Sequence, residues 1–398
     1  MAENKKTKTN YITLFIYRFF LFLLKIYIAL AWHYKIKSKY KIQKGESVIV
    51  VSNHQSFFDP MFILLSFNKL ISCIAADVLL SGKFKGFFFQ KMLKVIPKRK
   101  ATTDINAVSE MMKAVNNHQS LLFFPEGNRS YGEFQFYIGD NFAKFLKLFK
   151  STIILFNVRG GYGADPRWGH KKRRGKLEGE IKEILRYEDY ADLDNDELNE
   201  HILSSLRVYD SESKNQYQSN RRAEYLERVL YVCPKCHSIS TLNSIKNYFY
   251  CHNCDLKVEY GTDLHFHSED PAFNFQIMND WYQYQKRFMK DYDLSTMREI
   301  FHDSLGVLKT ANPMERIVTI AKGEVILTAK ELKIGNYIIP IKDIISASPI
   351  GGVILQFATK EQSYIIKGHK RFNPVKYVQL LNKLDSGIKE DLYFSLDD

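Results

Sequence analysis

His54 and Asp59, in the segment NHQSFFDP, have side chains that can move a proton. They follow the apolar run Ser47–Ser52, which is typical of a buried strand, and ligands of open α/β sheets gather at the carboxyl ends of strands. We expect Asp59 to cap a helix that begins at Pro60 and to accept a hydrogen bond from the imidazole of His54. Such a carboxylate holds the tautomer of the imidazole and raises its basicity. An Asp-Pro pair also starts many ordinary helices, so these residues alone do not establish a catalytic site.

A second group of polar residues, Glu126 and Arg129, lies in the later segment FPEGNRS. This segment follows another short apolar run, 121–124, and its Pro and Gly favour a tight turn. We therefore expect both side chains at the same edge of the sheet as His54. A carboxylate can bind a hydroxyl group, and a guanidinium can hold a phosphate with two hydrogen bonds.

The elements that must position these residues alternate between short apolar runs and helical stretches. A helix is expected where Ile105, Met111 and Val115 recur at helical spacing, with Thr103 or Asp104 as its cap. Strands are expected at three apolar runs, 47–52, 121–124 and 153–158. Strands separated by helices predict an α/β fold, with a largely parallel sheet flanked by helices.

NHQSFFDP followed by FPEGNRS resembles the glycerolipid (lysophospholipid) acyltransferase family, which includes the bacterial 1-acyl-sn-glycerol-3-phosphate acyltransferases. The resemblance covers about residues 45–160 and implies an acyltransferase-like fold there. It implies that His54 is the general base and that Asp59 orients it. It assigns binding of the acceptor to three residues of the second motif, Glu126, Gly127 and Arg129.

An intervening motif of this family ends in a basic residue that contacts the phosphate of the acceptor. The segment VIPKR aligns with it, so the resemblance also assigns Arg99 to acceptor binding. The chain has Lys98 before that Arg, where the family commonly has an acidic residue. Asn128 stands where the family often has Thr, and the run IILFNV lacks the usual Pro. Neither of these last two departures touches a group that the chemistry needs.

The implied reaction moves a fatty acyl group from the thioester of acyl-CoA or an acyl carrier protein to the sn-2 hydroxyl of lysophosphatidic acid, giving phosphatidic acid. His54 takes the hydroxyl proton, and backbone N–H groups are suitable donors for the oxyanion. An acyl-enzyme is not expected, because no Ser or Cys lies in a nucleophile motif and Cys73 fits a core position. Glycerol-3-phosphate, another lysophospholipid and a lyso-aminolipid stay open as acceptors.

The N-terminal segment, residues 11–32, is apolar enough to contact lipid, although it carries Arg18 and Lys25. These two charges lie on one face of a helix and can reach the interface, which favours a monotopic membrane helix over a single spanning anchor. Lys and Arg outnumber Asp and Glu by 57 to 44, a net charge of +13 that suits an anionic membrane surface. We expect the protein at the cytoplasmic face of the cell membrane.

Four of the five cysteines form two CxxC pairs at a spacing typical of structural zinc. In a reducing cytosol such pairs are metal ligands rather than disulfides, and four thiolates close a tetrahedral shell. The expected cofactor is one structural zinc ion per chain, in a small zinc ribbon, with no redox cofactor. The ligands are Cys233, Cys236, Cys251 and Cys254.

The C-terminal end resembles a PH- or GRAM-like domain, because short β-type runs are followed there by a helix that Asn373 is expected to cap. Composition also divides the whole chain into several expected parts. The expected parts are a basic tail and membrane helix at 1–42, an acyltransferase domain at 43–210, a linker at 211–227, a zinc ribbon at 228–265 and a β-rich domain at 300–388.

A hypothesis from another class is a nucleic-acid-binding protein built on the zinc ribbon and the charge of +13. Such a protein does not need the N-terminal lipid-contacting helix, and the sequence has no recognisable base-reading motif. We therefore expect no specific nucleic-acid partner.

Overall fold

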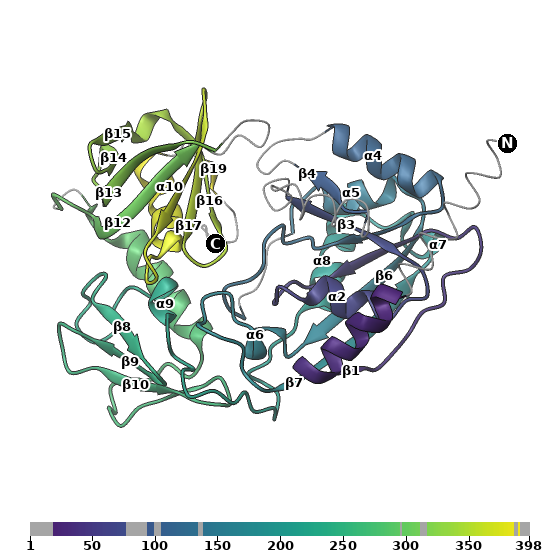
Figure 1. Ribbon diagram of the computed structural model, residues 1–398, viewed down its shortest axis with the longest axis horizontal. Helices are drawn as coiled ribbons and strands as arrows, with labels where there is room; N and C mark the ends of the chain where they lie inside the picture. Colours follow the sequence, from purple (N-terminus) through teal and green to yellow (C-terminus); the bar gives the residue numbers. More distant parts are fainter. Residues whose placement is uncertain are drawn as a thin grey trace. The chain divides into compact units, whose positions relative to one another are not determined.

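A computed structural model (Figure 1) describes seven parts of the chain, residues 19–76, 94–98, 105–133, 138–294, 297–310, 317–385 and 389–390. The chain forms two compact units. The first consists of Met1–Ser130, Gln135–Ala164 and Arg174–Asn215. The second consists of Tyr131–Phe134, Asp165–Arg173 and Gln216–Asp398.

The first unit is built on a seven-stranded sheet with the strand order β1-β7-β6-β2-β5-β3-β4. All neighbouring strands are parallel except β6 and β7, which are antiparallel. The expected largely parallel sheet is therefore confirmed. Its strands are β1 (His33–Ile36), β2 (Val48–Ser52), β3 (Ile71–Ala76), β4 (Ile96–Lys98), β5 (Ser120–Phe123), β6 (Thr152–Arg159) and β7 (Lys176–Leu185).

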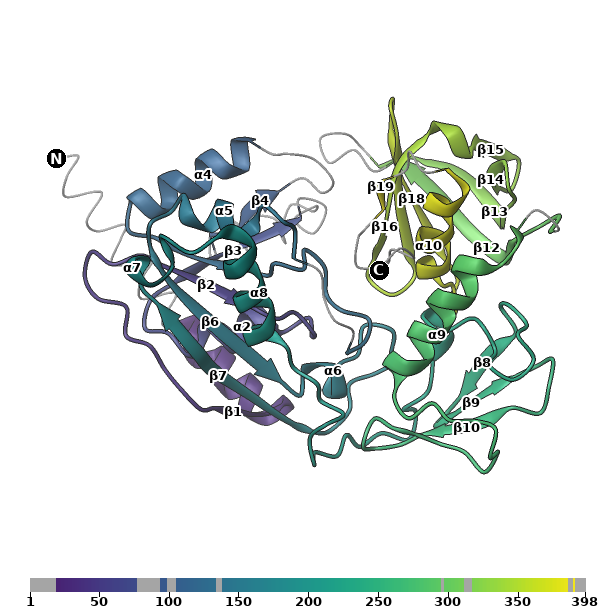
Figure 2. The same ribbon diagram turned by 180° about the vertical axis from the view of Figure 1, so that it is seen from behind.

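Helices lie on both faces of this sheet, as the two opposite views show (Figures 1 and 2). The helix expected around Ile105 is present, while its expected cap, Thr103 or Asp104, lies outside the described residues. The helices are residues 19–31, α2 (Asp59–Leu64), α4 (Ile105–Asn116), α5 (Phe142–Lys147), α6 (Gly161–Ala164), α7 (Tyr187–Tyr190) and α8 (Asn195–Leu206).

Strand β2 occupies the centre of the sheet, between β5 and β6, and all five of its residues are buried. Its branched side chains, VIVV, suit a strand with both faces covered. Near its end Val51 pairs with Phe123 of β5, and Ser52 pairs with Phe156 of β6. Because the three strands are parallel, the segments that follow them emerge at one edge.

The second unit contains a four-stranded antiparallel sheet that carries the CxxC pairs, with the strand order β11-β10-β9-β8. Trp281 of helix α9 (Met278–Asp291) packs against this sheet, with its ring centroid 5.3 Å from those of Phe249 and Phe266. The strands are β8 (Leu242–Ile245), β9 (Tyr248–Cys251), β10 (Lys257–Tyr260) and β11 (Phe266–His267), and a 3-10 turn, η3 (Leu226–Arg228), precedes them.

The C-terminal part of the second unit is an eight-stranded sheet closed by helix α10 (Pro374–Leu384). The side chain of Asn373 accepts a hydrogen bond from the N–H of Lys376, so the predicted cap is confirmed. The likeness to PH or GRAM domains stays a prediction. The strands are β12 (Phe301–Thr310), β13 (Thr319–Leu327), β14 (Glu331–Ile334), β15 (Tyr337–Pro340), β16 (Ile344–Ile350), β17 (Ile354–Thr359), β18 (Ser363–Gly368) and β19 (Lys389–Glu390), with a 3-10 turn, η5 (Ile341–Asp343).

The segment expected as a polar linker, 211–227, contains residues that are packed within the second unit. Tyr217 is fully buried, and its N–H donates to the carbonyl of Thr262 at 2.7 Å. Leu226 is also fully buried. Polar composition did not reveal these contacts, because a few apolar side chains are enough to fix such a segment. The expected domain limits, those of the linker included, stay predictions.

Gly160, at the carboxyl end of β6, has no room for a side chain. Its φ is +83°, and a Cβ would lie 2.2 Å from the carbonyl oxygen of Lys176. Gly45 has nearly the same φ, +82°, with nothing within 4 Å of a Cβ. We expect Gly45→Ala to cost about 1 kcal/mol of unfolding free energy, and Gly160→Ala at least about 3 kcal/mol. Urea unfolding of both variants measures this difference, and equal losses would contradict the geometry.

Candidate active site

His54 and Asp59 are hydrogen bonded to each other. The Nδ1 atom of His54 lies 3.0 Å from Oδ2 of Asp59, and the Asp59 side chain is fully buried. The same oxygen accepts the backbone N–H of Gln55 at 2.7 Å and that of Ser56 at 2.8 Å. The sequence therefore identified the pair correctly as neighbours in space.

The expected position of Asp59 as a helix cap was wrong. Helix α2 begins at Asp59 itself, its N-cap position is Phe58, and no side chain caps it. The carboxylate instead points back to the preceding loop, because that loop turns two backbone N–H groups towards Oδ2. Asp59 thus fixes the loop that carries His54.

The imidazole of His54 stacks on the ring of Phe124, with the ring centroids 4.1 Å apart and the planes at 22°. About 20% of the His54 side chain is exposed, so a substrate can reach it. Because Nδ1 is bonded to the carboxylate, Nε2 is the ring nitrogen suited to take a proton from a substrate. The arrangement has the geometry of a general base held by a buried carboxylate.

The FPEGNRS turn is tied to the backbone of His54 by two hydrogen bonds. Oε1 of Glu126 accepts the N–H of His54 at 2.9 Å, and the N–H of Ser130 donates to the carbonyl of His54 at 2.9 Å. Gly127 has a φ of +65°, which a tight turn here requires. The structure therefore brings Glu126 and its turn to His54, as the sequence predicted.

Of the remaining predicted acceptor ligands, Arg129 and Gly127 are among the described residues and Arg99 is not. Arg129 is half-buried and lies on the same turn as Glu126, while Gly127 is exposed there. One oxygen of Glu126 already holds the backbone of His54, so this carboxylate has a positioning contact that the sequence did not reveal.

Asn53 and Gln55, which flank His54, also position the loop. The amide of Asn53 donates to the carbonyl of Val158 and accepts the N–H of the same residue, both at 2.9 Å. The Nε2 atom of Gln55 donates to the carbonyl of Val208 at 3.0 Å. The sequence signal for Asn53 is an Asn directly after an apolar run. An amide in such a place is expected to be buried and therefore to need hydrogen-bond partners.

Asp210 is a further buried carboxylate in the first unit, 2% exposed. Its oxygens accept the N–H groups of Gly160 at 2.6 Å and Gly163 at 3.0 Å. Burial raises the pKa of Asp210 to about 6, and the negative charge of Asp59 adds to the rise, while the two N–H groups and Arg159 oppose it. No sequence motif marked this residue, which lies in a polar stretch.

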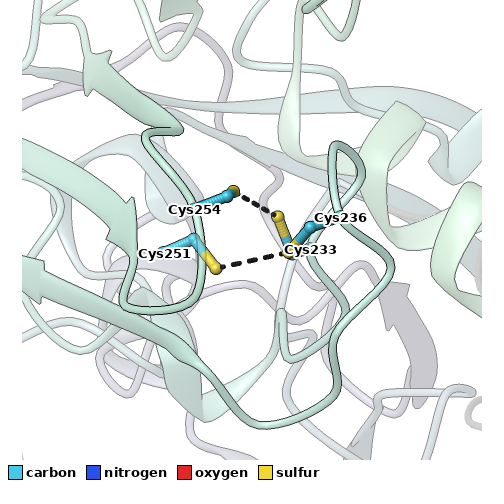
Figure 3. Close-up of side chains that lie close together, drawn as sticks. All are labelled: Cys233, Cys236, Cys251 and Cys254. Carbon is cyan, nitrogen blue, oxygen red and sulfur yellow. Dashed lines mark hydrogen bonds between the residues drawn. The ribbon is translucent and has the colours of Figure 1, made fainter.

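The four cysteines of the two CxxC pairs converge in the second unit (Figure 3). Their Sγ atoms all lie within 4.8 Å of one another, with Cys233 and Cys254 3.7 Å apart and Cys236 and Cys251 3.8 Å apart. Disulfide sulfurs would be about 2.0 Å apart, whereas sulfurs around a tetrahedral zinc ion with bonds of about 2.3 Å are about 3.8 Å apart. The cluster can therefore bind a metal ion.

The surroundings of the cysteines also suit a metal-binding cluster. The N–H of Asn253 points at Sγ of Cys251 at 3.3 Å, a contact that suits a thiolate ligand. His237 is turned away to the hydroxyl of Tyr284, 2.7 Å from its Nδ1 atom. The four sulfurs are therefore the candidate ligands of this cluster.

The helix formed by residues 19–31 has one buried and one exposed apolar face. Leu24 and Ile28 are buried, and no helix among the described residues has the length and apolar character needed to cross a membrane. The exposed face, here called the apolar stripe, has the spacing of a single helix side. It consists of Phe19, Phe22, Leu23, Ile26, Tyr27 and Leu30.

The apolar stripe leads towards the loop of His54 through aromatic contacts. The ring of Tyr27 lies 6.2 Å from that of Phe58, and the ring of Phe58 lies 5.3 Å from that of Phe57. Phe57 is 62% exposed, three positions after His54. Exposed apolar groups thus extend from the helix to the edge of the candidate site.

The chain is similar to a known protein family and to a solved structure. Residues 33–156 match the sequence model of the family described as Acyltransferase. The chain is similar to a solved structure of the 1-acyl-sn-glycerophosphate (LPA) acyltransferase, PlsC, from Thermotoga maritima, at 19% identity and a TM-score of 0.41, covering 48% of this chain and 78% of that chain. No curated protein sequence matches the chain. The stretch that matches the family model, residues 33–156, includes the His54–Asp59 pair.

Proposed function

We propose that the protein transfers a fatty acyl group from the thioester of acyl-CoA or an acyl carrier protein to the sn-2 hydroxyl of lysophosphatidic acid, giving phosphatidic acid. The observation that carries this proposal is the hydrogen bond between His54 and the buried Asp59, inside the stretch that matches the acyltransferase family. An exposed imidazole fixed by a carboxylate suits a reaction that must remove a proton from an alcohol.

The proposed reaction has two steps. Nε2 of His54 takes the hydroxyl proton as the alcohol oxygen bonds to the thioester carbon, which leaves a tetrahedral oxyanion and an imidazolium. The carbon–sulfur bond then breaks, and the imidazolium returns the proton to the leaving thiolate. Asp59 stabilises the imidazolium between these steps, because its carboxylate lies 3.0 Å from Nδ1.

Arg129, on the turn that is bonded to His54, is the proposed ligand of the acceptor phosphate, together with Arg99. A guanidinium binds two phosphate oxygens at once, which would fix the distance from the phosphate to the reacting hydroxyl. Glu126 and Gly127 complete the proposed acceptor site. Glycerol-3-phosphate and other lysophospholipids remain alternative acceptors for the same chemistry.

The apolar stripe is the proposed membrane contact. A helix with a buried face on the protein and an apolar face on the outside can lie in the plane of a lipid surface. Lys25, exposed beside the stripe, can reach anionic headgroups. This placement, at the cytoplasmic face of the cell membrane, would bring the lipid acceptor to the edge where Phe57 is exposed.

The cysteine cluster is the proposed site of one structural zinc ion per chain. All four ligand positions are taken by sulfur, which leaves no open position for a substrate and favours a structural over a catalytic role. The zinc ion would stabilise the sheet β8–β11 directly.

The catalytic proposal predicts that His54→Ala lowers the turnover of acyl transfer by about 10²–10⁴-fold, the usual contribution of a positioned base. Asp59→Asn should lower turnover less, since an amide oxygen can still accept hydrogen bonds but cannot stabilise an imidazolium. The measurement is the initial rate of phosphatidic acid formation from a thioester and lysophosphatidic acid.

The matched control for this experiment is His201→Ala. His201 also pairs with a carboxylate, its Nε2 atom lying 2.8 Å from Glu183, but this pair is more exposed and distant in sequence from the motifs. Its loss should leave turnover within about twofold, as surface substitutions usually do. Turnover of His54→Ala close to that of the unaltered protein would refute the acyltransferase proposal.

The membrane proposal predicts that Phe22→Ser, Ile26→Ser and Leu30→Ser together weaken binding to vesicles of phosphatidylcholine and phosphatidylglycerol. If each side chain contributes roughly 1 kcal/mol, the loss is about a hundredfold. Sedimentation with vesicles measures it. Three exposed apolar residues of the second unit serve as the control when changed to Ser: Ile245, Tyr248 and Ile338. Equal binding by both triple variants would contradict the assignment of the stripe.

The zinc proposal predicts one zinc ion per chain in purified protein and its loss in the double variant Cys233→Ser, Cys236→Ser. Because a structural metal contributes folding free energy, protection from hydrogen exchange should fall in strands β8–β11. Cys73→Ser changes a cysteine of the first unit and should keep the metal. Elemental analysis that found iron, or no metal, would overturn the assignment.

A further inference from the structure

Asp210 is buried and bound to the segment that follows β6, which lies against the loop of His54. It binds both ends of the short turn at the start of α6, through the N–H groups of Gly160 and Gly163. Two charge-assisted hydrogen bonds from one buried carboxylate hold such a turn rigidly. The side chain therefore determines where the residues between these two glycines lie.

Gly161, inside this turn, is in contact with the residues that hold His54. A Cβ at Gly161 would lie 3.1 Å from Cβ of Gln55 and 3.5 Å from Oδ1 of Asp59. The N–H of Tyr162 also points at Oε1 of Gln55, at 3.4 Å. The turn that Asp210 binds thus forms a wall that packs against Gln55 and the Asp59 carboxylate.

The Oδ1 atom of Asp59 faces this wall. It is buried and has no hydrogen-bond partner among the described residues, whereas Oδ2 accepts three hydrogen bonds. Packing against Gly161 therefore supports the carboxylate on the side where it accepts no hydrogen bond from the described residues. A shift of this wall would move the carboxylate relative to the imidazole.

We propose that Asp210 is a positioning residue for acyl transfer, which fixes the Gly160–Gly163 turn against Asp59 and thereby fixes the orientation of His54. This inference rests on the function proposed above. It assigns a role to a residue outside both motifs, which does not touch the substrate.

Replacing Asp210 by Asn tests the proposal. The amide oxygen can still accept one N–H group, but the amide nitrogen cannot accept the other, so the turn is held at one end only. We expect kcat to fall about tenfold to a hundredfold, because small misplacements of catalytic groups have effects of this size. The KM values for the thioester and for lysophosphatidic acid should stay within about twofold, since Asp210 contacts neither.

The matched control is Asp194→Asn, in the same unit. Asp194 also binds a backbone N–H, that of Asp196 at 2.9 Å, where it caps helix α8 far from the motifs. Its replacement should leave kcat unchanged. An equal loss in both variants would show a general effect of stability and would refute the positioning role.

A pH profile separates positioning from a merely structural role. The pKa of Asp210 is raised to about 6, and Asp59 and Arg159 are the charged groups that act on it. Below this pH the carboxyl of Asp210 is protonated and has one hydrogen-bond acceptor fewer. Asp210→Asn lacks that acceptor at every pH. The kcat of the unaltered protein divided by that of Asp210→Asn should therefore be large at neutral pH and fall as the pH drops through about 6. A ratio that does not change with pH would contradict the inference.

Gly161→Ala provides a second route if Asp210→Asn does not fold. The backbone of Gly161 does not need a positive φ, and the added methyl group would press on Gln55 and Asp59 from the same wall. We expect a similar loss in kcat at unchanged KM. Full activity of a folded Gly161→Ala protein would refute the inference. Absence of acyl transfer in the unaltered protein would instead refute the proposed function.

Discussion

The buried carboxylate of Asp59 is the constraint on which the site depends. An ionised carboxylate is costly to bury unless strong hydrogen bonds compensate for the lost hydration. Here Oδ2 receives the N–H groups of Gln55 and Ser56 as well as the imidazole of His54. These bonds stabilise the charge and, in doing so, set the shape of the loop. The same hydrogen bonds therefore stabilise the buried carboxylate of Asp59 and hold the partly exposed imidazole of His54 in place.

The sheet supplies the rigid frame for this loop. Strand β2 is fully buried between two parallel neighbours, so its carboxyl end has a fixed position. The amide of Asn53 joins the loop to β6, and Glu126 joins it to the turn after β5. Three neighbouring strands of the sheet, β6, β2 and β5, thus hold the loop of His54. The apolar stripe lies on the helix of residues 19–31. A reaction between a membrane lipid and a thioester would use both features.

The sequence predicted those parts of the site that local pattern determines. The apolar run before His54 and the Pro-Gly turn around Glu126 fixed their places at one edge of a parallel sheet. Two features were not predicted. Asp59 turns back to its own loop instead of capping α2, because the N–H groups of Gln55 and Ser56 face it, and the residue pattern does not show the shape of that loop. Asp210 was missed because its partners, Gly160 and Gly163, lie far away in the sequence.

The central claim is that this site acylates a phosphate-bearing lipid hydroxyl. The most direct measurement supplies the full-length protein with an acyl thioester and offers lysophosphatidic acid and glycerol-3-phosphate side by side, with both products quantified by mass spectrometry. We expect phosphatidic acid to form in large excess over acylated glycerol-3-phosphate. Acylation of neither compound, with the thioester left intact, would contradict it.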